Sequence, residues 1–204
     1  MFYPNKSQEK RLVKKGFQLI AGIDEAGRGA WAGPIVAAAV IMPLDNKIKG
    51  IKDSKLLRLP ERKSLYKKIT ESALAWGVGI VDYDVIDKDG LTRANFLAME
   101  LAVKSIKPLP DYLLIDGRNL KIADLSSSGI IDGDYKVFSI AAASIVAKVT
   151  RDNLMDELDE KYPAYGFKQH KGYGTNQHFQ MLMQYGVSKI HRRSYKPIKD
   201  LLEG

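Results

Sequence analysis

The chain contains no cysteine, which excludes disulfide bonds, thiolate metal sites and a cysteine nucleophile. No apolar run approaches the ~20 residues that a membrane-spanning helix requires, and the N-terminus lacks the apolar segment of a secretory signal. There is no G-x-S-x-G motif and no H-E-x-x-H motif, so nothing indicates a serine hydrolase or a zinc protease. Together these absences favour a cytoplasmic protein whose chemistry does not use sulfur.

Histidine is also scarce, and the three histidines show no metal-ligand spacing. We expect His170, His178 and His191 to be structural or to contact phosphate. The G-R-G element in "DEAGRG" is neither a Walker loop nor a complete G-x-G-x-x-G, so a nucleotide cofactor is weakly supported. The chemistry must therefore come from carboxylates, hydroxyls and basic side chains.

The balance of charge is basic, with 32 Lys+Arg against 24 Asp+Glu and a net charge of +8. Such an excess favours a polyanionic partner, because each phosphate contact releases counterions and adds affinity. The alternative is that the charge only keeps the protein in solution. With 204 residues and no internal repeat, the chain fits a single catalytic domain over residues 17–204, preceded by a basic leader or short helix over residues 1–16.

The apolar pattern predicts an α/β fold with a mixed central sheet, because strands dominate early and alternate with helices later. Buried strands are expected over residues 17–24, 33–42, 77–84 and 111–117. Helices are expected over residues 60–76, 91–106, 139–162 and 176–186. In the second of these helices the predicted buried face consists of Ala94, Leu97, Leu101 and Ala102.

Acidic residues end two of the predicted strands. Asp24 and Glu25 follow the first strand, and Asp116 ends the fourth. Acids at the ends of neighbouring buried strands would converge and repel one another, at a desolvation cost of several kcal/mol. A divalent cation such as Mg²⁺, which prefers oxygen ligands, would remove that conflict. The alternative is that each acid begins a solvated turn.

A polar stripe marks the long alanine-rich helix. Ser144, Lys148 and Asp152 are spaced i, i+4, i+8 and so share one face, which a close-packed helix could turn toward a cleft. The alternative is that Lys148 extends to solvent and Asp152 pairs with a neighbour such as Arg151. A carboxylate-only site on a basic protein indicates metal-assisted phosphodiester hydrolysis.

Seven blocks occur in the order of a known family: "GIDEAGRG", "AGPIVAAAVI", "KDSK", "LLIDG", "SIAAASIVAKVTRD", "YGFKQHKGYGT" and "IHRRSY". From about residue 20 to residue 195 the chain resembles bacterial ribonuclease HII, the type 2 ribonuclease H. The resemblance implies a ribonuclease H-like fold with a mixed sheet flanked by helices and a small helical C-terminal part over about residues 160–204. It also implies an enzyme that cuts the RNA strand of RNA–DNA hybrids. Such an enzyme would also nick DNA duplexes 5′ of an embedded ribonucleotide, leaving a 3′-hydroxyl and a 5′-phosphate.

The resemblance also assigns residues. Two Mg²⁺ or Mn²⁺ ions would be held by the catalytic acids Asp24, Glu25, Asp116 and Asp152. The ribose-sensing turn would be Gly27, Arg28 and Gly29, with Tyr173 stacking at the RNA-to-DNA junction. Further substrate contacts are expected from Lys55, Ser144, Lys148 and Arg192. The alternatives are that Tyr173 fills a loop-packing site and that the basic tail around Arg192 is a solvated face.

Two departures from the family pattern are visible. Ala30 and Trp31 follow the G-R-G turn where proline is common, which predicts either a less rigid loop or an added contact from an exposed Trp31. Tyr195 stands where phenylalanine is usual. We expect a monomer that binds RNA–DNA hybrids and ribonucleotide-containing DNA.

Other functions remain open at this stage. A related nuclease or resolvase could share the fold, and type 3 ribonuclease H normally has an N-terminal domain for which no room is expected before residue 20. A binding module that has lost catalysis is disfavoured, because all four acids are present.

Overall fold

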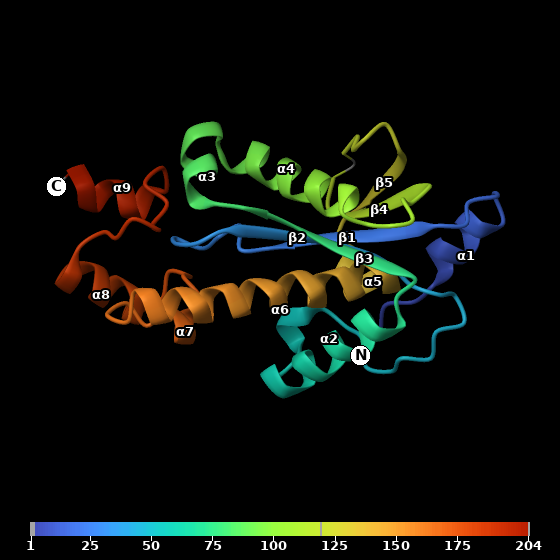
Figure 1. Ribbon diagram of the computed structural model, residues 1–204, viewed down its shortest axis with the longest axis horizontal. Coiled ribbons are helices and arrows are strands. Elements are labelled where there is room, and N and C mark those ends of the chain that lie inside the picture. Colours follow the sequence, from blue (N-terminus) through green and yellow to red (C-terminus); the bar gives the residue numbers. More distant parts are fainter. Residues whose placement is uncertain (1–2, 119, 204) are drawn as a thin grey trace.

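The computed structural model describes residues 3–118 and 120–203. At its centre is a five-stranded sheet in the order β3-β2-β1-β4-β5 (Figure 1). The strands are β1 (Ile20–Ala26), β2 (Ile35–Ile41), β3 (Ala75–Val81), β4 (Tyr112–Asp116) and β5 (Ser126–Ile130). β1, β2 and β3 pair antiparallel, whereas β4 pairs parallel to β1 and β5 parallel to β4. The predicted mixed sheet is therefore confirmed.

Helices cover both faces of this sheet. α6 (Phe138–Lys161) lies along one face with α2 (Leu59–Ser72) packed outside it, and α3 (Tyr83–Asp89) and α4 (Leu91–Lys104) cover the other (Figure 1). β2 is buried along its whole length, and its alternate residues serve opposite layers: Ala37 and Ala39 face the α4 side, whereas Ala38 and Val40 face α6. Small side chains let these helices approach closely.

The contact between α6 and β1 is the closest of these approaches. A Cβ atom at Gly22 would lie 2.1 Å from the carbonyl carbon of Ser139, so only glycine fits under the start of α6. This packing fixes the polar stripe of α6 relative to the acids at the end of β1.

Short helices complete both ends of the chain. α1 (Ser7–Val13) packs Leu12 into an apolar cluster with β4 and α6, and the buried carboxylate of Glu9 accepts from the Ser139 N–H at 2.9 Å. At the opposite end lie α7 (Phe167–His170), α8 (Asn176–Tyr185) and α9 (Lys196–Glu203), which share a separate apolar cluster (Figure 1). None of the helices in the described part of the chain has the length and apolar character needed to span a membrane.

Several predicted boundaries were wrong for local reasons. The helix predicted over residues 60–76 ends at Ser72, and the alternating burial from Ala75 to Val81 marks a strand instead. The strand predicted to continue to residue 84 stops earlier, because Tyr83 begins α3. β5 was not predicted, since "SSSGI" is a polar edge strand without an apolar pattern. In α4 the side chain of Leu101 is 39% exposed, and Ala98 takes its place in the core.

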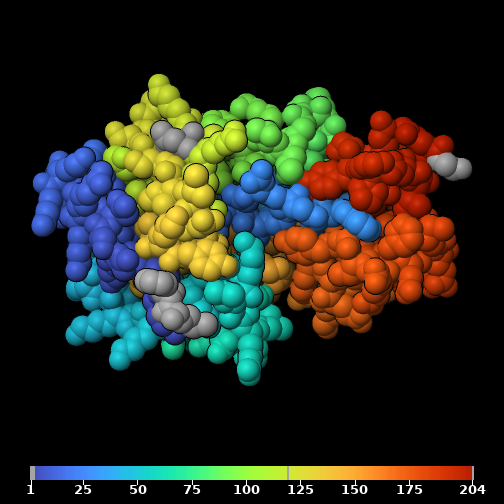
Figure 2. Space-filling model, turned by 180° about the vertical axis from the view of Figure 1, so that it is seen from behind, coloured from blue at the N-terminus to red at the C-terminus, as the bar shows by residue number. Residues whose placement is uncertain are grey.

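The loop that follows β1 is held between segments of the C-terminal part. Isolated β-bridges join Ala30 to Tyr173 and Ala32 to His191. Figure 2 shows this blue segment wedged against the orange and red residues of the C-terminal helices. The turn beside the acids is therefore built from three regions that are far apart in sequence.

Candidate active site

A cavity of about 250 Å³ opens at the end of β1, where the predicted acids lie. It is lined by Asp24, Glu25, Ala26, Gly27, Arg28, Gly29, Ser54, Lys55, Ser144, Lys148 and Tyr173. The structure thus brings most of the predicted site residues together around one space. The exceptions are Asp116, Asp152 and Arg192, which do not line it.

Asp24, Glu25 and Asp116 lie close enough to repel one another. Burial, and then the charges of Glu25 and Asp116, raise the pKa of Asp24 well above its usual value. Burial also raises the pKa of Glu25; the nearby Arg28 opposes this shift and Asp116 adds to it. The expected convergence of the strand-terminal acids is therefore observed.

The parallel pairing of β1 with β4 explains how Asp116 reaches this place. Ile23 is registered against Ile115, so the next residues, Asp24 and Asp116, reach the same edge of the sheet. One carboxylate oxygen of Asp116 accepts from the Gly133 N–H at 2.7 Å, which fixes the side chain. Asp116 also lines a neighbouring cavity of about 850 Å³, which shares Glu25 and Arg28 with the first.

Asp152 is held by two cations. Its Oδ1 lies 2.6 Å from the Lys148 Nζ, and its Oδ2 lies 3.2 Å from an Arg62 Nη1. The pairing with Arg151 that was considered from the sequence does not occur. Arg62 comes from α2 and also donates to the carbonyl oxygens of Ser54 and Leu57, both at 2.9 Å. No sequence pattern pointed to Arg62, because only the fold brings α2 beside α6.

The acids suit a divalent cation by donor type and by charge. Carboxylate oxygens are the ligands that Mg²⁺ and Mn²⁺ prefer, and the repulsion among Asp24, Glu25 and Asp116 would be relieved by a positive ion. Within residues 3–118 and 120–203, however, no three acidic or histidine side chains form a ready-made metal cage. Asp152 in particular has both oxygens engaged by Lys148 and Arg62.

Further acids beside the site were missed from the sequence. Burial, followed by the charges of Asp116 and Asp53, raises the pKa of Asp134 to about 6. Asp53 is buried and accepts from the backbone N–H of Lys55 at 2.9 Å, while the Lys55 ammonium lies 4.0 Å from Asp134. Asp134 comes shortly after β5, and because that polar strand has no apolar pattern, no strand-end signal of the kind that identified Asp116 pointed to it.

The two glycines of the G-R-G turn serve different purposes. Gly27 has a φ of +97°, and a Cβ there would lie 2.1 Å from the Nε of Arg151, so it accommodates a buried arginine. A Cβ at Gly29 would meet no atom within 4 Å, so its backbone lies open to the cavity. Between them, Arg28 places a guanidinium nitrogen 3.4 Å from Glu25. Only Gly29 has the open backbone that a substrate-facing role requires.

Two fully buried arginines support this turn from below. Arg151 donates to the carbonyl oxygens of Pro34, Lys171 and Ala32. Arg192 donates to the carbonyl oxygens of Gly33 and Arg28 at 3.0–3.1 Å. The prediction that Arg192 contacts substrate is therefore wrong. Its guanidinium is 0% exposed and instead fixes the backbone of the G-R-G turn.

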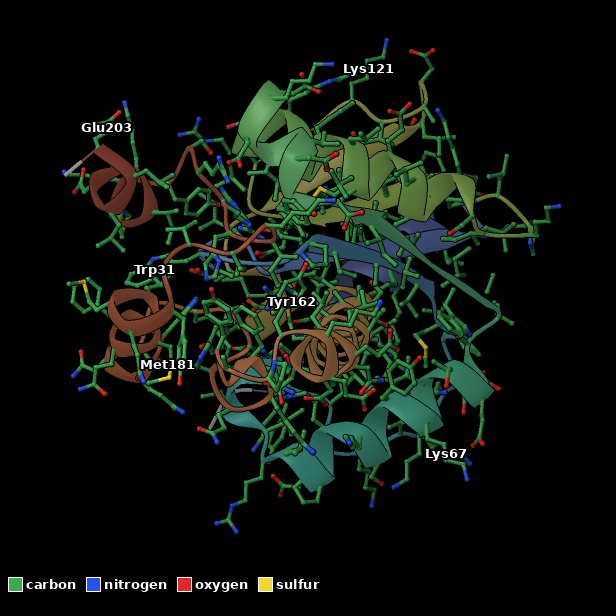
Figure 3. All side chains as sticks on the ribbon, turned by 60° about the vertical axis from the view of Figure 1, so that its left-hand side comes forward. Trp31, Lys67, Lys121, Tyr162, Met181 and Glu203 are labelled. Carbon is green, nitrogen blue, oxygen red and sulfur yellow. The ribbon has the colours of Figure 1, made fainter. Side chains whose placement is uncertain are left out.

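Trp31 is a packing residue rather than an exposed contact. Its N–H donates to the Gly172 carbonyl and its carbonyl accepts from the Arg192 N–H, both at 2.7 Å. The indole packs over Gly174, where a Cβ would lie 2.1 Å from the ring, and 5.5 Å from His178. Figure 3 shows Trp31 beside the helix that carries Met181. Hydrogen bonds on both edges keep the loop fixed without proline.

The second departure, Tyr195, supplies a hydroxyl to the same turn. The Tyr195 hydroxyl accepts from an Arg192 Nη1 at 2.9 Å and donates to the carbonyl oxygen of Arg28. A phenylalanine would provide neither bond. The turn therefore has one more hydrogen bond than the usual family residue allows.

Tyr173 reaches the cavity from the C-terminal part. Its ring centroid lies 5.2 Å from the Lys148 Nζ and 5.1 Å from the Arg151 guanidinium carbon. The side chain is half-buried and lines the cavity instead of filling a packing site. An aromatic face and the acids Asp24 and Glu25 are thus presented to the same space.

Comparison with known proteins agrees with this geometry. The ribonuclease HII family model matches residues 21–198. The chain is 52% identical over 194 residues to ribonuclease HII of Enterococcus faecalis, covering 95% of this chain and 76% of that one. It is 49% identical over 206 residues to ribonuclease HII of Dehalococcoides mccartyi, covering 98% and 96%. The crystal structure of ribonuclease H2 from Pyrococcus horikoshii OT3 matches with a TM-score of 0.78 at 26% identity, covering 91% and 98%.

A mixed sheet flanked by helices, with carboxylates at the edge where β1 and β4 end, defines a metal-dependent endoribonuclease of the ribonuclease H-like fold. Such enzymes act on the RNA strand of RNA–DNA hybrids. The chain belongs to the ribonuclease HII family.

Proposed function

We propose that the enzyme, besides cutting hybrids, nicks DNA duplexes on the 5′ side of an embedded ribonucleotide and leaves a 3′-hydroxyl and a 5′-phosphate. One observation carries the proposal: the acids Asp24 and Glu25, the open backbone of Gly29 and the Tyr173 ring line a single cavity. The 2′-hydroxyl is the group that distinguishes RNA from DNA. A site that senses it next to the acids can act on one ribonucleotide.

The four acids Asp24, Glu25, Asp116 and Asp152 would hold two divalent ions, Mg²⁺ or Mn²⁺. When bound, such ions activate the attacking water at neutral pH and stabilise the departing 3′-oxygen. Lys148 and Arg62 hold Asp152 in place before binding, and no protein general base is required.

Basic side chains at the rim would bind phosphates. The Arg28 side chain is 56% exposed and that of Lys55 is 78% exposed, so both are accessible to a polyanion. Ser144 and Lys148 line the deeper wall beside the acids. Because phosphate contacts carry no base information, these residues set affinity and register rather than sequence preference.

The neighbouring cavity of about 850 Å³ would take the strand as it continues past the acids. It is lined by Arg93, Arg118 and Phe96 in addition to Glu25 and Asp116. The Arg93 guanidinium lies over the Phe96 ring at 5.4 Å. In the described part of the chain neither arginine forms an ion pair, so both charges are available for phosphates while Phe96 offers a stacking face.

The test is cleavage of three matched duplexes: an RNA–DNA hybrid, a DNA duplex with one ribonucleotide, and all-DNA. We expect the first two to be cut with Mg²⁺ or Mn²⁺ and not with EDTA, and end-labelling to show a 5′-phosphate on the downstream product. Cleavage of the all-DNA duplex would favour a related nuclease instead. Metal-independent binding without cleavage would indicate a binding module.

We further propose that residues 17–204 act as one catalytic domain and that the enzyme works as a monomer. The apolar cluster of the C-terminal helices includes Ala32, from the loop after β1, which supports treating the two parts as one unit. Light scattering with and without a hybrid duplex would test the monomer, and a constant dimer mass would contradict it.

A further inference from the structure

Three buried histidines form one cluster behind Tyr173. The rings of His170 and His178 stack with centroids 4.3 Å apart and planes 13° from parallel. The Nε2 atoms of His178 and His191 lie 3.0 Å apart, within hydrogen-bond distance. The His178 and His191 side chains are fully buried, and neither takes part in the chemistry described above. Because burying polar side chains is costly, we expect this histidine cluster to have a structural or functional role.

At one end of the cluster, a hydrogen bond to the main chain determines which ring nitrogen of His178 donates and which accepts. The Nδ1 of His178 lies 3.0 Å from the carbonyl oxygen of Tyr173, which can only accept. His178 must therefore carry its proton on Nδ1, and when neutral it must accept at Nε2. The bond between the two rings then requires His191 to donate from its Nε2.

The opposite end gives the same direction independently. The backbone N–H of Ser188 lies 3.0 Å from the Nδ1 of His191 and can only donate, and the Ser188 hydroxyl, 2.7 Å from the same Nδ1, can donate as well. His191 must therefore accept at Nδ1 and carry its proton on Nε2. The two ends agree on one neutral chain of donors that runs from Ser188 through His191 and His178 to the Tyr173 carbonyl.

Neutral rings also agree with the surroundings. Burial, helped by the nearby histidine rings, lowers the pKa of both His178 and His191 to about 4, although the backbone hydrogen bonds at Tyr173 and Ser188 act in the opposite direction. A charged His178 would place two donors against each other at the Nε2 contact, and a charged His191 would do so at the Ser188 N–H. Trp31 closes the cluster, with its ring 5.5 Å from His178.

We propose that His178 and His191 are positioning residues that hold Tyr173 for recognition of the RNA-to-DNA junction. The proposal rests on the proposed function, with Tyr173 stacking at the RNA-to-DNA junction as the resemblance to the family implies. The Tyr173 side chain lies between two cations, and its hydroxyl makes no hydrogen bond within the described residues. Its position therefore depends on its main chain, whose N–H donates to the His170 carbonyl and whose carbonyl accepts from the Thr175 N–H and from the His178 Nδ1. His191 acts one step further back, by keeping His178 in the Nδ1–H form.

The first test needs no activity. Long-range ¹H–¹⁵N correlation spectra of the imidazole nitrogens should show His178 protonated at Nδ1 and His191 at Nε2 at neutral pH. The opposite tautomer on either ring would overturn the relay, whatever the substrate of the enzyme.

The second test uses matched substitutions at His178. His178→Asn keeps an amide donor near the position of Nδ1, whereas His178→Phe keeps an aromatic ring without a donor. We expect His178→Phe to lower the ratio of kcat/KM for a single embedded ribonucleotide to that for a uniform hybrid about 10-fold, and His178→Asn to restore most of it. At His191 we expect His191→Phe to lower this ratio as His178→Phe does, and His191→Gln to restore most of it as His178→Asn does.

Repeating the pair in a Tyr173→Ala background separates positioning from stability. If His178 acts through the Tyr173 side chain, His178→Phe should leave the ratio of the two kcat/KM values unchanged in the Tyr173→Ala background. It should lower the melting temperature equally in the native and the Tyr173→Ala backgrounds. An unchanged ratio for His178→Phe in the native background, with a lowered ratio for Tyr173→Ala, overturns this inference alone. An unchanged ratio for Tyr173→Ala overturns the junction role and the inference together.

Discussion

Arg62 and Asp152 form an ion pair at 3.2 Å that joins α2 to the far end of the acidic site. The same guanidinium holds the Ser54 and Leu57 carbonyls, so it connects the loop that carries Lys55 to an acid of the site. Groups that orient metal ligands typically change metal affinity or activity 10–100-fold when removed.

We therefore predict that Arg62→Gln lowers kcat/KM about 10-fold or more and raises the Mn²⁺ concentration needed for half-maximal activity. Isothermal titration with Mn²⁺ alone gives a second measurement that does not depend on turnover. Lys63→Gln removes a neighbouring charge from the exposed face of α2 and is the control. If Arg62→Gln and Lys63→Gln changed kcat/KM and the Mn²⁺ requirement equally, the effect would come from the lost positive charge and not from the contact between Arg62 and Asp152.

Replacing Asp24 should stabilise the metal-free protein while abolishing cleavage. Because the pKa of Asp24 is raised in the folded state, its ionisation lowers stability as pH rises above the ordinary value near 3.8. We expect Asp24→Asn to raise the melting temperature in EDTA by roughly 2–5 °C, since about 1 kcal/mol corresponds to roughly 2–4 °C at this size. Calorimetry at pH 7.5 measures this, and a lower melting temperature would contradict the repulsion among the acids.

Tyr195→Phe should loosen the G-R-G turn. The substitution removes the hydroxyl that joins Arg192 to the Arg28 carbonyl, a net loss of about 1 kcal/mol of stability. We expect KM for hybrid to rise roughly 2–5-fold, with kcat nearly unchanged because the acids are not moved. Tyr185→Phe, at a tyrosine that is 50% exposed, is the control. A fall in kcat alone would place Tyr195 in the chemical step.

The Arg93 and Arg118 groove should determine how binding depends on salt. We expect Arg93→Ala with Arg118→Ala to reduce the slope of log K against log[salt] by about 1–2, since each phosphate contact contributes about 0.9. Fluorescence anisotropy in Ca²⁺ measures the slope on hybrids. Lys67→Ala with Lys104→Ala is the control at two exposed lysines outside the cavity. An unchanged slope would show that the nucleic-acid strand does not bind in this groove.

The histidine cluster should make the fold sensitive to acid. The pKa of His178 and of His191 is about 4 in the folded state, against 6.5 in an unfolded chain. The unfolded state therefore binds more protons, and stability is lost as pH falls from about 6.5 toward 4, by up to about 3 kcal/mol for each ring.

Asp24, Glu25 and Asp134 have raised pKa values and act in the opposite direction over part of this range. Urea unfolding is therefore compared at pH 7 and pH 4.5 in the Asp24→Asn, Glu25→Gln, Asp134→Asn triple variant. We expect a clear fall in the midpoint, and an unchanged midpoint would mean that the rings are not held neutral.

The sequence was sufficient for the features that depend on local pattern. Acids placed at strand ends and the stripe of Ser144, Lys148 and Asp152 are periodic signals, and the fold brings both to one edge of the sheet. β5 escaped prediction, because a half-exposed edge strand can be built from serines and glycine.

What could not be predicted depends on contacts between distant segments. Arg62 and Asp152 are 90 residues apart, and nothing near either one indicates the other. Arg192 was misassigned because a basic tail suggests a surface, whereas backbone carbonyls of the β1–β2 loop provide enough acceptors to bury a guanidinium. Trp31 could be placed only once Gly174 and His178 were known to lie beside it.

The buried guanidinium of Arg192 also bears on how the enzyme is made. A ribosome synthesises Arg28 164 residues before Arg192, so Asp24 and Glu25 emerge long before the group that fixes the neighbouring carbonyl. A nascent chain that ends before residue 192 carries Asp24 and Glu25 without the guanidinium that anchors the Arg28 carbonyl. The G-R-G turn thus gains this anchor only after the C-terminal part has been synthesised.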